Sequence, residues 1–563
     1  MWPRSGSRPR LVSRAGSIEL ALVLAGFGLL AAAITYPLLF HLGSIGYKAY
    51  QVGDAQYSIW NVAWVAHALL TDPRHVLDAN IFYPHPRTLI FSEANLAAGA
   101  LAVPVYFVSH NPFAAHNSVV LLSFVLSGTG TYYLVRYLVA DRRAAVVAGI
   151  SFALCPYVFG HLPHIQLLMT AGIPFSLLAF HRLADRPSVG RGATLGVAMG
   201  LQGLACAYYA VFVAVLIGYA VLFTAMSERM WRERRYWLAV LAAAVVSSAI
   251  VLPLFSAYVA LQRDTGFGRE LGEATNYAAT WSSYLTSSSR GSGWIYPALR
   301  AYTTLPAYTD QLFPGAVALI LGLAGIVVAT RAGGRTARHG VLYASIVALA
   351  FWESLGPSGG LYSVMYALPG FSFLRAPSRF GVMVAFGLAV LAGVAIARLL
   401  TVARRPALVT AALIAATVAE QGTVIPWTPI EPISPAYHLL ASQPDGAILE
   451  MPPRSHKFAF TRTQYMINST AHWKPLVNAY SDFIPDSLYD SLDTLAQFPS
   501  RDSFALLARD RVRYVAFDLR EYRRDPAIHD KLAVSLQEFA PYLHELYQDD
   551  RVKLFEIVGY PAQ

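Results

Sequence analysis

The chain has 563 residues, of which 55% are hydrophobic and only 13% charged, and its formal net charge is +10. A soluble protein carries about a quarter charged residues, so this composition excludes an ordinary soluble enzyme. Nucleic-acid binding is also excluded, because the basic residues lie in short clusters between apolar runs, as the positive-inside rule predicts. Many of those runs are about 17–25 residues long, and together they predict a polytopic α-helical membrane protein.

The first apolar run covers residues 20–40 and follows four arginines, Arg4, Arg8, Arg10 and Arg14. It is too long for the apolar region of a signal peptide, and it lacks a clean small-x-small cleavage site. We therefore expect a retained first helix with the N-terminus in the cytoplasm. The long loop that follows, residues 41–113, then lies outside.

The segment 94–108 within this loop is apolar but short, and it contains Pro104. The next full-length run, residues 118–135, ends at the basic residues Arg136, Arg142 and Arg143. If segment 94–108 crossed the membrane, this cluster and all later ones would lie outside. Because orientation follows the basic residues of short loops, we expect the segment to lie flat or to re-enter.

Later apolar runs alternate consistently, with the basic clusters on the cytoplasmic side. The expected crossings are residues 144–159, 165–180, 194–205, 210–224, 238–259, 312–329, 341–355, 381–397 and 408–424. The pattern predicts about eleven crossings in total, with the N-terminus inside and the C-terminus outside.

From about residue 426 the long apolar runs stop and charged residues become frequent. The β-rich runs GAILEM, PLVNAY, VRYVAFDL and VKLFEIVG alternate with helix-like stretches such as AIHDKLAVSLQEFAPYLHEL. We predict a transmembrane domain over residues 1–425 and an extracytoplasmic α/β domain over residues 426–563. The latter is large enough to bury its own core.

Gly53-Asp54 begins an amphipathic segment just after the first helix, with the pattern Gly-Asp-x-x-x-x-x-Trp-x-x-x-Trp. The pattern predicts a turn followed by a helix, whose aromatic residues Tyr57, Trp60 and Trp64 suit the membrane interface. A carboxylate there could act as a general base on an acceptor hydroxyl, or bind a metal that bridges to phosphate. Aspartate at a helix start is also a common cap, and that simpler role stays open.

This layout resembles the GT-C superfamily of integral membrane glycosyltransferases. The shared features are the inner N-terminus, the long first outer loop with an acidic residue near its start, flat juxtamembrane segments, the helix number and the outer C-terminal domain. The segments PGFSFLRAPSRF and DGAILEMPP with KPLVNAYS look similar to recurring segments of a bacterial branch. That branch lies near the O-mannosyl, aminoarabinose and YfhO-type transferases.

The resemblance implies an inverting transfer of a sugar from a polyprenyl-phosphate donor to an envelope acceptor, at the outer face of the bacterial inner membrane. Asp54 would take the catalytic acidic position. Several relatives carry two adjacent acids in this loop, but here Ala55 follows Asp54. A requirement for a divalent cation is therefore left open, since no metal motif is clear.

Five further residues are candidates for substrate binding. His161 and His164 lie in an outer turn, where they either cap the turn or line the pocket for acceptor or donor phosphate. Glu93 is either a second carboxylate near Asp54 or an ordinary solvated loop residue. Arg375 and Arg379 precede a helix on the outer side. They could bind the leaving phosphate in bidentate fashion, or contact lipid headgroups.

Two other classes of protein remain open. A transporter or lipid flippase would favour ionisable residues near the middle of the membrane and two related halves. A non-catalytic scaffold for envelope assembly would use its outer domain to bind a partner, and the missing second acid is compatible with it. An Asp54 that caps its helix would favour the scaffold, whereas a cavity lined by Asp54 and an arginine would favour sugar transfer.

Overall fold

The computed structural model describes residues 14–47, 53–301, 310–368, 371 and 374–561. The arginines at positions 4, 8 and 10 therefore lie outside the described residues. Internal contacts divide the chain into two units. We call residues 1–40 and 119–425 the helical unit, and residues 41–118 and 426–563 the α/β unit. The first outer loop thus groups with the C-terminal residues, although the sequence-based division placed it in the transmembrane domain.

The helical unit is built from long apolar helices. These are α1 (Arg14–Ile34), α4 (Pro112–Val139, whose first turns belong to the α/β unit), α5 (Arg142–Ala153), α6 (Pro156–Gly160), α7 (Ile165–Leu168), α8 (Gly172–Asp185), α9 (Val189–Ala205), α10 (Ala207–Ser227), α11 (Arg234–Thr265), α14 (Ala316–Ala332), α15 (Gly334–Ser354), α17 (Gly381–Val402) and α18 (Pro406–Gln421). Short helices α12 (Leu271–Asn276), α13 (Ile295–Arg300) and α16 (Leu361–Tyr366) lie in the connections.

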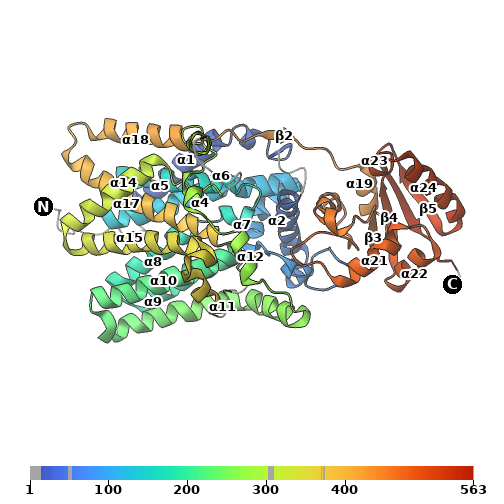
Figure 1. Cartoon of the computed structure of the whole chain (residues 1–563), viewed down its shortest axis with the longest axis horizontal. Helices are drawn as coiled ribbons and strands as arrows, with labels where there is room; N and C mark the ends of the chain where they lie inside the picture. The colour runs from blue at the N-terminus through green and yellow to red at the C-terminus, as the bar shows by residue number, and fades with distance from the viewer. Residues whose placement is uncertain (1–13, 48–52, 302–309, 369–370, 372–373, 562–563) are drawn as a thin grey trace. The chain divides into compact units, whose positions relative to one another are not determined.

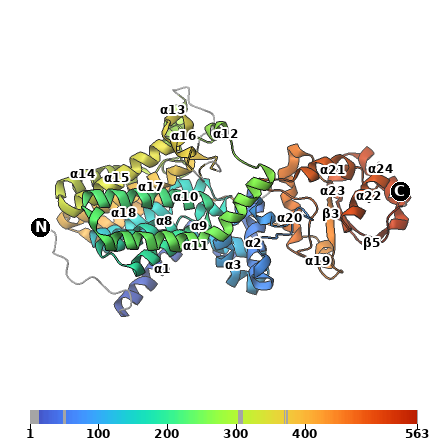
Figure 2. The ribbon, with the colours of Figure 1, turned by 90° about the horizontal axis from the view of Figure 1, so that it is seen from below.

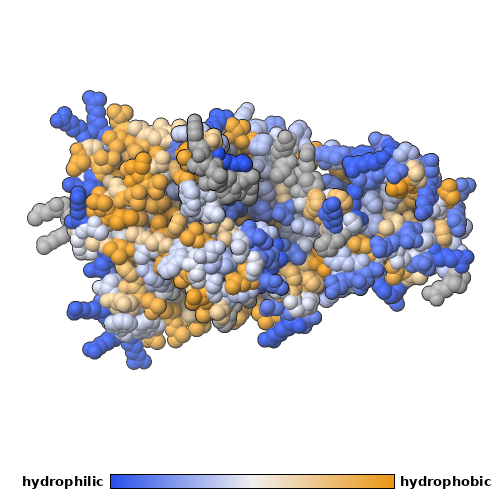
Figure 3. Space-filling view, in the orientation of Figure 1, coloured by the Kyte–Doolittle hydropathy of each residue, from blue (hydrophilic) through white to orange (hydrophobic). Residues whose placement is uncertain are grey.

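Seven helical segments among the described residues are long and apolar enough to cross a membrane. They cover Gly16–Ile34, Pro112–Val139, Arg142–Gly160, Ile165–Asp185, Ala207–Ser227, Arg234–Thr265 and Pro377–Val402. Figure 3 shows hydrophobic side chains gathered over the helices of this unit, and mostly hydrophilic ones over the C-terminal strands and helices. The prediction of a multi-pass helical membrane protein is confirmed, whereas the total of about eleven crossings and the orientation stay predictions.

Helix α17 forms the centre of the helical unit. It packs against α5, α14 and α15, and both views show it beside α15 (Figures 1 and 2). Its residues from Gly381 to Ala397 are all buried. A helix that is apolar on every side is expected to be enclosed by others. Small residues allow the close approach: a Cβ atom added at Gly325 of α14 would lie 2.0 Å from the carbonyl oxygen of Leu391.

Replacement of Gly325 by alanine is expected to destabilise this contact by about 1–3 kcal/mol, because the backbone of α17 cannot retreat without losing its other neighbours. Gly218→Ala on α10 is the matched control, since a Cβ atom there meets nothing within 4 Å. Thermal unfolding of the full-length protein in detergent measures the stability of both variants. Equal melting of Gly325→Ala and the parent protein would show that the two helices can separate freely.

The α/β unit contains a four-stranded sheet of order β3-β4-β6-β5. Figure 1 labels β3, β4 and β5 of this sheet. The strands are β3 (Ala447–Met451), β4 (Val512–Asp518), β5 (Leu543–Gln548) and β6 (Val552–Ile557); the helices are α19 (Pro435–Ala441), α20 (Thr463–Ser469), α21 (Asp486–Ala496), α22 (Arg501–Arg509), α23 (Leu519–Tyr522) and α24 (Pro526–Glu538). Strands β3 and β4 run parallel, and β6 pairs antiparallel with both β4 and β5.

Three of the four β-rich runs contain strands β3, β4 and β6, but two predictions in this part are wrong. The run PLVNAY contributes only an isolated bridge between Leu476 and Ile448. Strand β5 instead forms from the end of a stretch that was predicted to be helical. The reason is tertiary, because β5 gains its hydrogen bonds by pairing with β6 across a short turn.

The loop part of this unit holds two helices, α2 (Asp54–Thr71) and α3 (Leu96–Ser109), which pack together. The short strands β1 (Ile45–Tyr47) and β2 (Trp427–Pro429) pair antiparallel and join the start of the loop to the C-terminal residues. Helix α3 has 14 residues, a length of about 21 Å, which is less than the roughly 30 Å of a bilayer core. This length is compatible with the flat or re-entrant segment that we predicted.

The sheet of the α/β unit encloses an ionisable residue, Glu450, in the middle of β3. Its side chain is 0% exposed and accepts a hydrogen bond of 2.9 Å from the hydroxyl group of Tyr437. Removal from water disfavours the charged form and raises the pKa of Glu450 from 4.5 to about 8.

This pKa shift predicts that the protein becomes less stable as the pH rises. Between pH 4.5 and about 8 the folded state keeps a proton on Glu450 that the unfolded state releases, so the free energy of unfolding falls with pH across this range. Glu450→Gln should flatten the dependence, whereas Glu545→Gln, an exposed residue on β5, should not. Thermal unfolding of the full-length variants from pH 5 to pH 9 tests this, and an unchanged slope in Glu450→Gln would contradict it.

Candidate functional site

Asp54 is the first residue of α2, one position after the N-cap, so it is not the N-cap residue that the capping alternative required. The N-cap is Gly53, with φ 78° and ψ −134°. The Asp54 side chain is exposed and lies in the first turn, where a negative charge interacts favourably with the helix dipole.

The aromatic residues of α2 anchor the helix within its own unit. Trp60 is fully buried and donates a hydrogen bond of 3.1 Å to Asn80, and Trp64 donates one of 2.9 Å to the carbonyl oxygen of Val76. The membrane-interface role predicted for Trp60 is therefore wrong. Its contacts hold α2, and with it Asp54, against the loop.

Glu93 lies beside the second turn of α2, where its backbone carbonyl accepts a hydrogen bond of 3.0 Å from Asn61. Asn61 is seven residues after Asp54, which places it about 10 Å further along the helix axis. A second acid, Asp482, accepts a hydrogen bond of 2.7 Å from Ser92. The sequence analysis missed Asp482, although it directly follows the segment KPLVNAYS that carried the resemblance.

A metal requirement gains no support from these acids. Among the residues that the structure describes, no group of three or more histidine, cysteine, aspartate or glutamate side chains could hold a metal ion.

His161 and His164 lie in the helical unit, between α6 and α7, with ring centroids 6.3 Å apart. The Nδ1 atom of His161 is 2.7 Å from the carbonyl oxygen of Tyr157. Because a carbonyl oxygen only accepts, Nδ1 carries the proton and Nε2 is the acceptor atom. Loss of solvation lowers the pKa of His161 to about 3, so this ring is neutral at physiological pH.

Arg379 lies in a short 3-10 helix, Pro377–Phe380, directly before α17. Its guanidinium carbon lies 4.1 Å from the centre of the Tyr208 ring, a cation–π contact. Within the described part of the chain, no carboxylate lies within ion-pair distance of this half-buried arginine. A partly buried charge without a counter-ion is costly, so the position favours an anion from outside the chain.

Arg375 differs from Arg379 because its charge has a partner. Its Nη1 atom lies 3.7 Å from Oε1 of Glu273, which also accepts a hydrogen bond of 3.3 Å from Arg269. Of the two arginines proposed for donor phosphate, only Arg379 therefore has its positive charge uncompensated by a carboxylate among the described residues.

Three tyrosines connect the histidines and arginines of the helical unit. We call Tyr157, Tyr208 and Tyr209 the tyrosine cluster. Tyr157 stacks on His161 with centroids 4.2 Å apart, and its hydroxyl lies 3.1 Å from that of Tyr209. Tyr208 contacts the Arg379 guanidinium and accepts a hydrogen bond of 3.1 Å from the backbone N–H of Arg375. In the sequence, residues 206–209 lie between two expected crossings, and no local pattern there indicated this cluster.

The structure thus brings four of the predicted residues together in the helical unit, through the tyrosine cluster. Asp54 and Glu93 belong to the α/β unit, where Asp54 begins α2 and the backbone carbonyl of Glu93 contacts Asn61 of the same helix. The first group can hold an anion, and the second presents carboxylates for proton transfer.

Comparison with known proteins places this geometry in context. The sequence model of a family described as "Domain of unknown function (DUF6311)" matches residues 25–419. A sequence comparison with curated proteins gave no match.

Among solved structures, the arabinofuranosyltransferase AftD from Mycobacteria aligns with a TM-score of 0.59 and 16% identity. The alignment covers 97% of this chain but 42% of that protein, so the chain spans less than half of its length. ArnT from Cupriavidus metallidurans aligns over 98% of this chain and 100% of its own, with 15% identity and a TM-score of 0.39, too low to support an argument. The likeness to AftD shows that the two chains share a fold, and the GT-C superfamily with its finer branch stays a prediction.

Proposed function

The chain belongs to this family of unknown function and has the fold of a membrane glycosyltransferase, and from this we propose that it transfers a sugar. The donor is a polyprenyl-phosphate sugar, the acceptor is a hydroxyl group of the cell envelope, and the reaction occurs at the outer face of the bacterial inner membrane. Because AftD is named as an arabinofuranosyltransferase, a donor that carries arabinofuranose is the first one to test.

In the proposed reaction, Asp54 acts as general base and takes the proton of the acceptor hydroxyl. The oxygen attacks the anomeric carbon of the sugar while the bond from that carbon to the phosphate oxygen breaks. The polyprenyl phosphate leaves with the bonding electrons, and the configuration at the anomeric carbon inverts. Arg379 stabilises the charge that develops on the phosphate.

The single observation that carries this proposal is the positive charge of Arg379 beside the tyrosine cluster, which no carboxylate of the described residues compensates. A phosphate would supply a counter-ion, and the hydroxyl of Tyr208, which accepts from the backbone N–H of Arg375, would donate a hydrogen bond to one of its oxygens. Neutral His161, with Nε2 as an acceptor, would bind a sugar hydroxyl rather than phosphate. His164, Arg375 and Glu93 are proposed to shape the surroundings.

The test is an assay of the purified full-length protein with radiolabelled polyprenyl-phosphate sugars, followed as transfer or as hydrolysis of the donor. Transfer in the parent protein that depends on both Asp54 and Arg379 supports the proposal. The scaffold alternative predicts no turnover and no saturable donor binding. The flippase alternative predicts movement of the intact lipid between leaflets without cleavage of the sugar–phosphate bond.

A further inference from the structure

The start of α2 is tied to helix α20 of the same α/β unit. The backbone N–H of Gly53 donates a hydrogen bond of 3.1 Å to the hydroxyl of Thr463, the first residue of α20. The same hydroxyl lies 2.6 Å from Oε1 of Gln56, to which it donates. Thr463 is 0% exposed, so water cannot replace these bonds. One buried hydroxyl therefore joins the N-cap and the first turn of the helix that carries Asp54.

A second connection runs through two glutamine side chains. Nε2 of Gln56 donates a hydrogen bond of 2.8 Å to Oε1 of Gln464, whose own Nε2 donates one of 3.1 Å to Asn468 one turn further along α20. The side-chain amides of Gln56 and Gln464 each have a defined orientation, because in both the oxygen accepts one hydrogen bond and the nitrogen donates another. We call Thr463 and Gln464, with their bonds to Gly53 and Gln56, the α20 latch.

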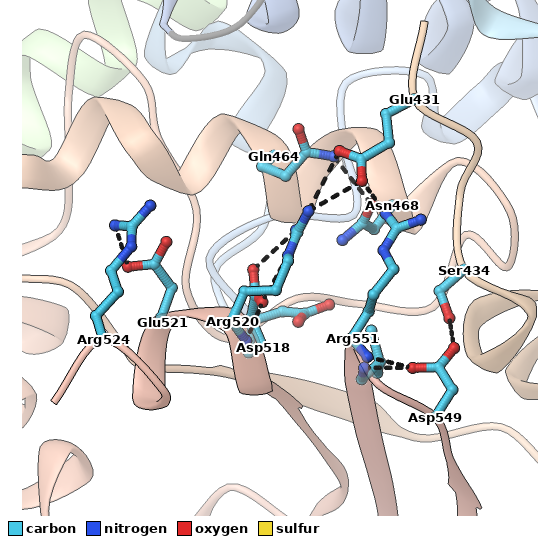
Figure 4. A network of polar contacts seen from close by, with 12 residues as sticks. Glu431, Ser434, Gln464, Asn468, Asp518, Arg520, Glu521, Arg524, Asp549 and Arg551 are labelled. Atoms are coloured by element: carbon cyan, nitrogen blue, oxygen red, sulfur yellow. Dashed lines mark hydrogen bonds and ion pairs between the residues drawn. The ribbon is translucent and has the colours of Figure 1, made fainter. Parts of the chain in front are cut away.

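Helix α20 is itself firmly held. Arg462, directly before Thr463, is 0% exposed and donates hydrogen bonds to the backbone carbonyls of Pro453, Arg454 and Ala479. Figure 4 shows Gln464 and Asn468 beside a network in which Glu431 accepts from Arg520 at 3.1 Å and pairs with Arg551 at 2.8 Å. The latch thus connects the start of α2 to a rigid part of the unit.

From this geometry we propose that Thr463 and Gln464 are positioning residues for the Asp54 carboxylate. Gly53 has a φ of 78°, a conformation that glycine reaches easily and that leaves the neighbouring peptide several orientations. The bond from its N–H to Thr463 selects one of them and so sets the direction of the first turn. A misplacement of about 1 Å at a reacting group can cost about 100-fold in rate, so this direction matters for proton transfer.

This inference rests on the proposed role of Asp54, but its structural half is tested without activity. Hydrogen–deuterium exchange of the full-length protein should show faster exchange, by about tenfold, in the peptide that contains Gly53 when Thr463 is replaced by valine. Thr463→Ser, which keeps the hydroxyl, should exchange like the parent. Thr470→Val is the matched control, because this buried threonine is the C-cap of α20 and its hydroxyl donates to the carbonyl of Ile467 within the same helix. Unchanged exchange in Thr463→Val overturns the latch.

The catalytic half is measured as sugar transfer. Thr463→Val is expected to lower kcat by about 10-fold to 100-fold with little change in the KM for the donor, and Thr463→Ser to restore it. If Thr463→Val folds poorly, Gln464→Ala at a half-buried position replaces it as the test, with a smaller expected loss of kcat. Faster exchange with an unchanged kcat overturns the positioning role. If Asp54→Asn keeps full activity, Asp54 is not the base. The hydrogen–deuterium exchange data still show in that case whether the α20 latch holds Gly53.

Discussion

Asp54→Asn is expected to abolish sugar transfer while the protein still binds the donor. Asparagine has the size of aspartate but cannot accept the proton of the acceptor hydroxyl, so the loss is expected in kcat, by about 100-fold to 10,000-fold. The donor should bind as before, because the proposed phosphate contact is made by Arg379. Initial rates with the radiolabelled donor, and donor binding at equilibrium, measure the two effects separately.

Asp72→Asn is the matched control for this substitution. Asp72 is the C-cap of the same helix, and its exposed carboxylate bonds to His75 at 2.7 Å. The control should retain the rate of the parent protein. Full activity of Asp54→Asn would remove the base assignment, and equal losses in both variants would show that the helix, rather than the Asp54 carboxylate, was damaged.

Arg379→Gln is expected to weaken binding of the polyprenyl-phosphate donor by about 10-fold to 100-fold, the value of a charge-assisted hydrogen bond to phosphate. The glutamine keeps hydrogen-bonding capacity but has no charge. The donor affinity of Arg379→Lys should lie between those of the parent protein and Arg379→Gln, because an ammonium group retains the charge and loses the bidentate geometry. Titration of the full-length protein with polyprenyl phosphate, followed by intrinsic fluorescence, gives the dissociation constants.

Arg375→Gln serves as the comparison at a neighbouring arginine. Its charge is already compensated by Glu273, so the donor dissociation constant should change by less than about threefold. If Arg375→Gln weakens binding more than Arg379→Gln does, the phosphate site must be assigned to Arg375. If neither substitution has an effect, the proposed function loses the observation that carries it.

The sequence by itself determined the features that depend on local patterns. Apolar runs of membrane length predicted the multi-pass helical unit, because a bilayer selects helices by length and hydropathy alone. Short β-rich runs located β3, β4 and β6. The turn at Gly53 and the helix after it were also predictable, since glycine followed by an amphipathic segment is a local signal.

The tertiary structure decided what depends on partners far away in the chain. Arg375 and Arg379 look equivalent in the sequence, and only the contact with Glu273 distinguishes them. Residue 463 could not be connected with Gly53 from any local pattern, because 410 residues separate the two ends of their hydrogen bond. Strand β5 likewise exists through its pairing with β6. Hydrophobic patterns and secondary-structure propensities act over a few residues, whereas counter-ions and strand partners depend on which distant residues the fold brings together.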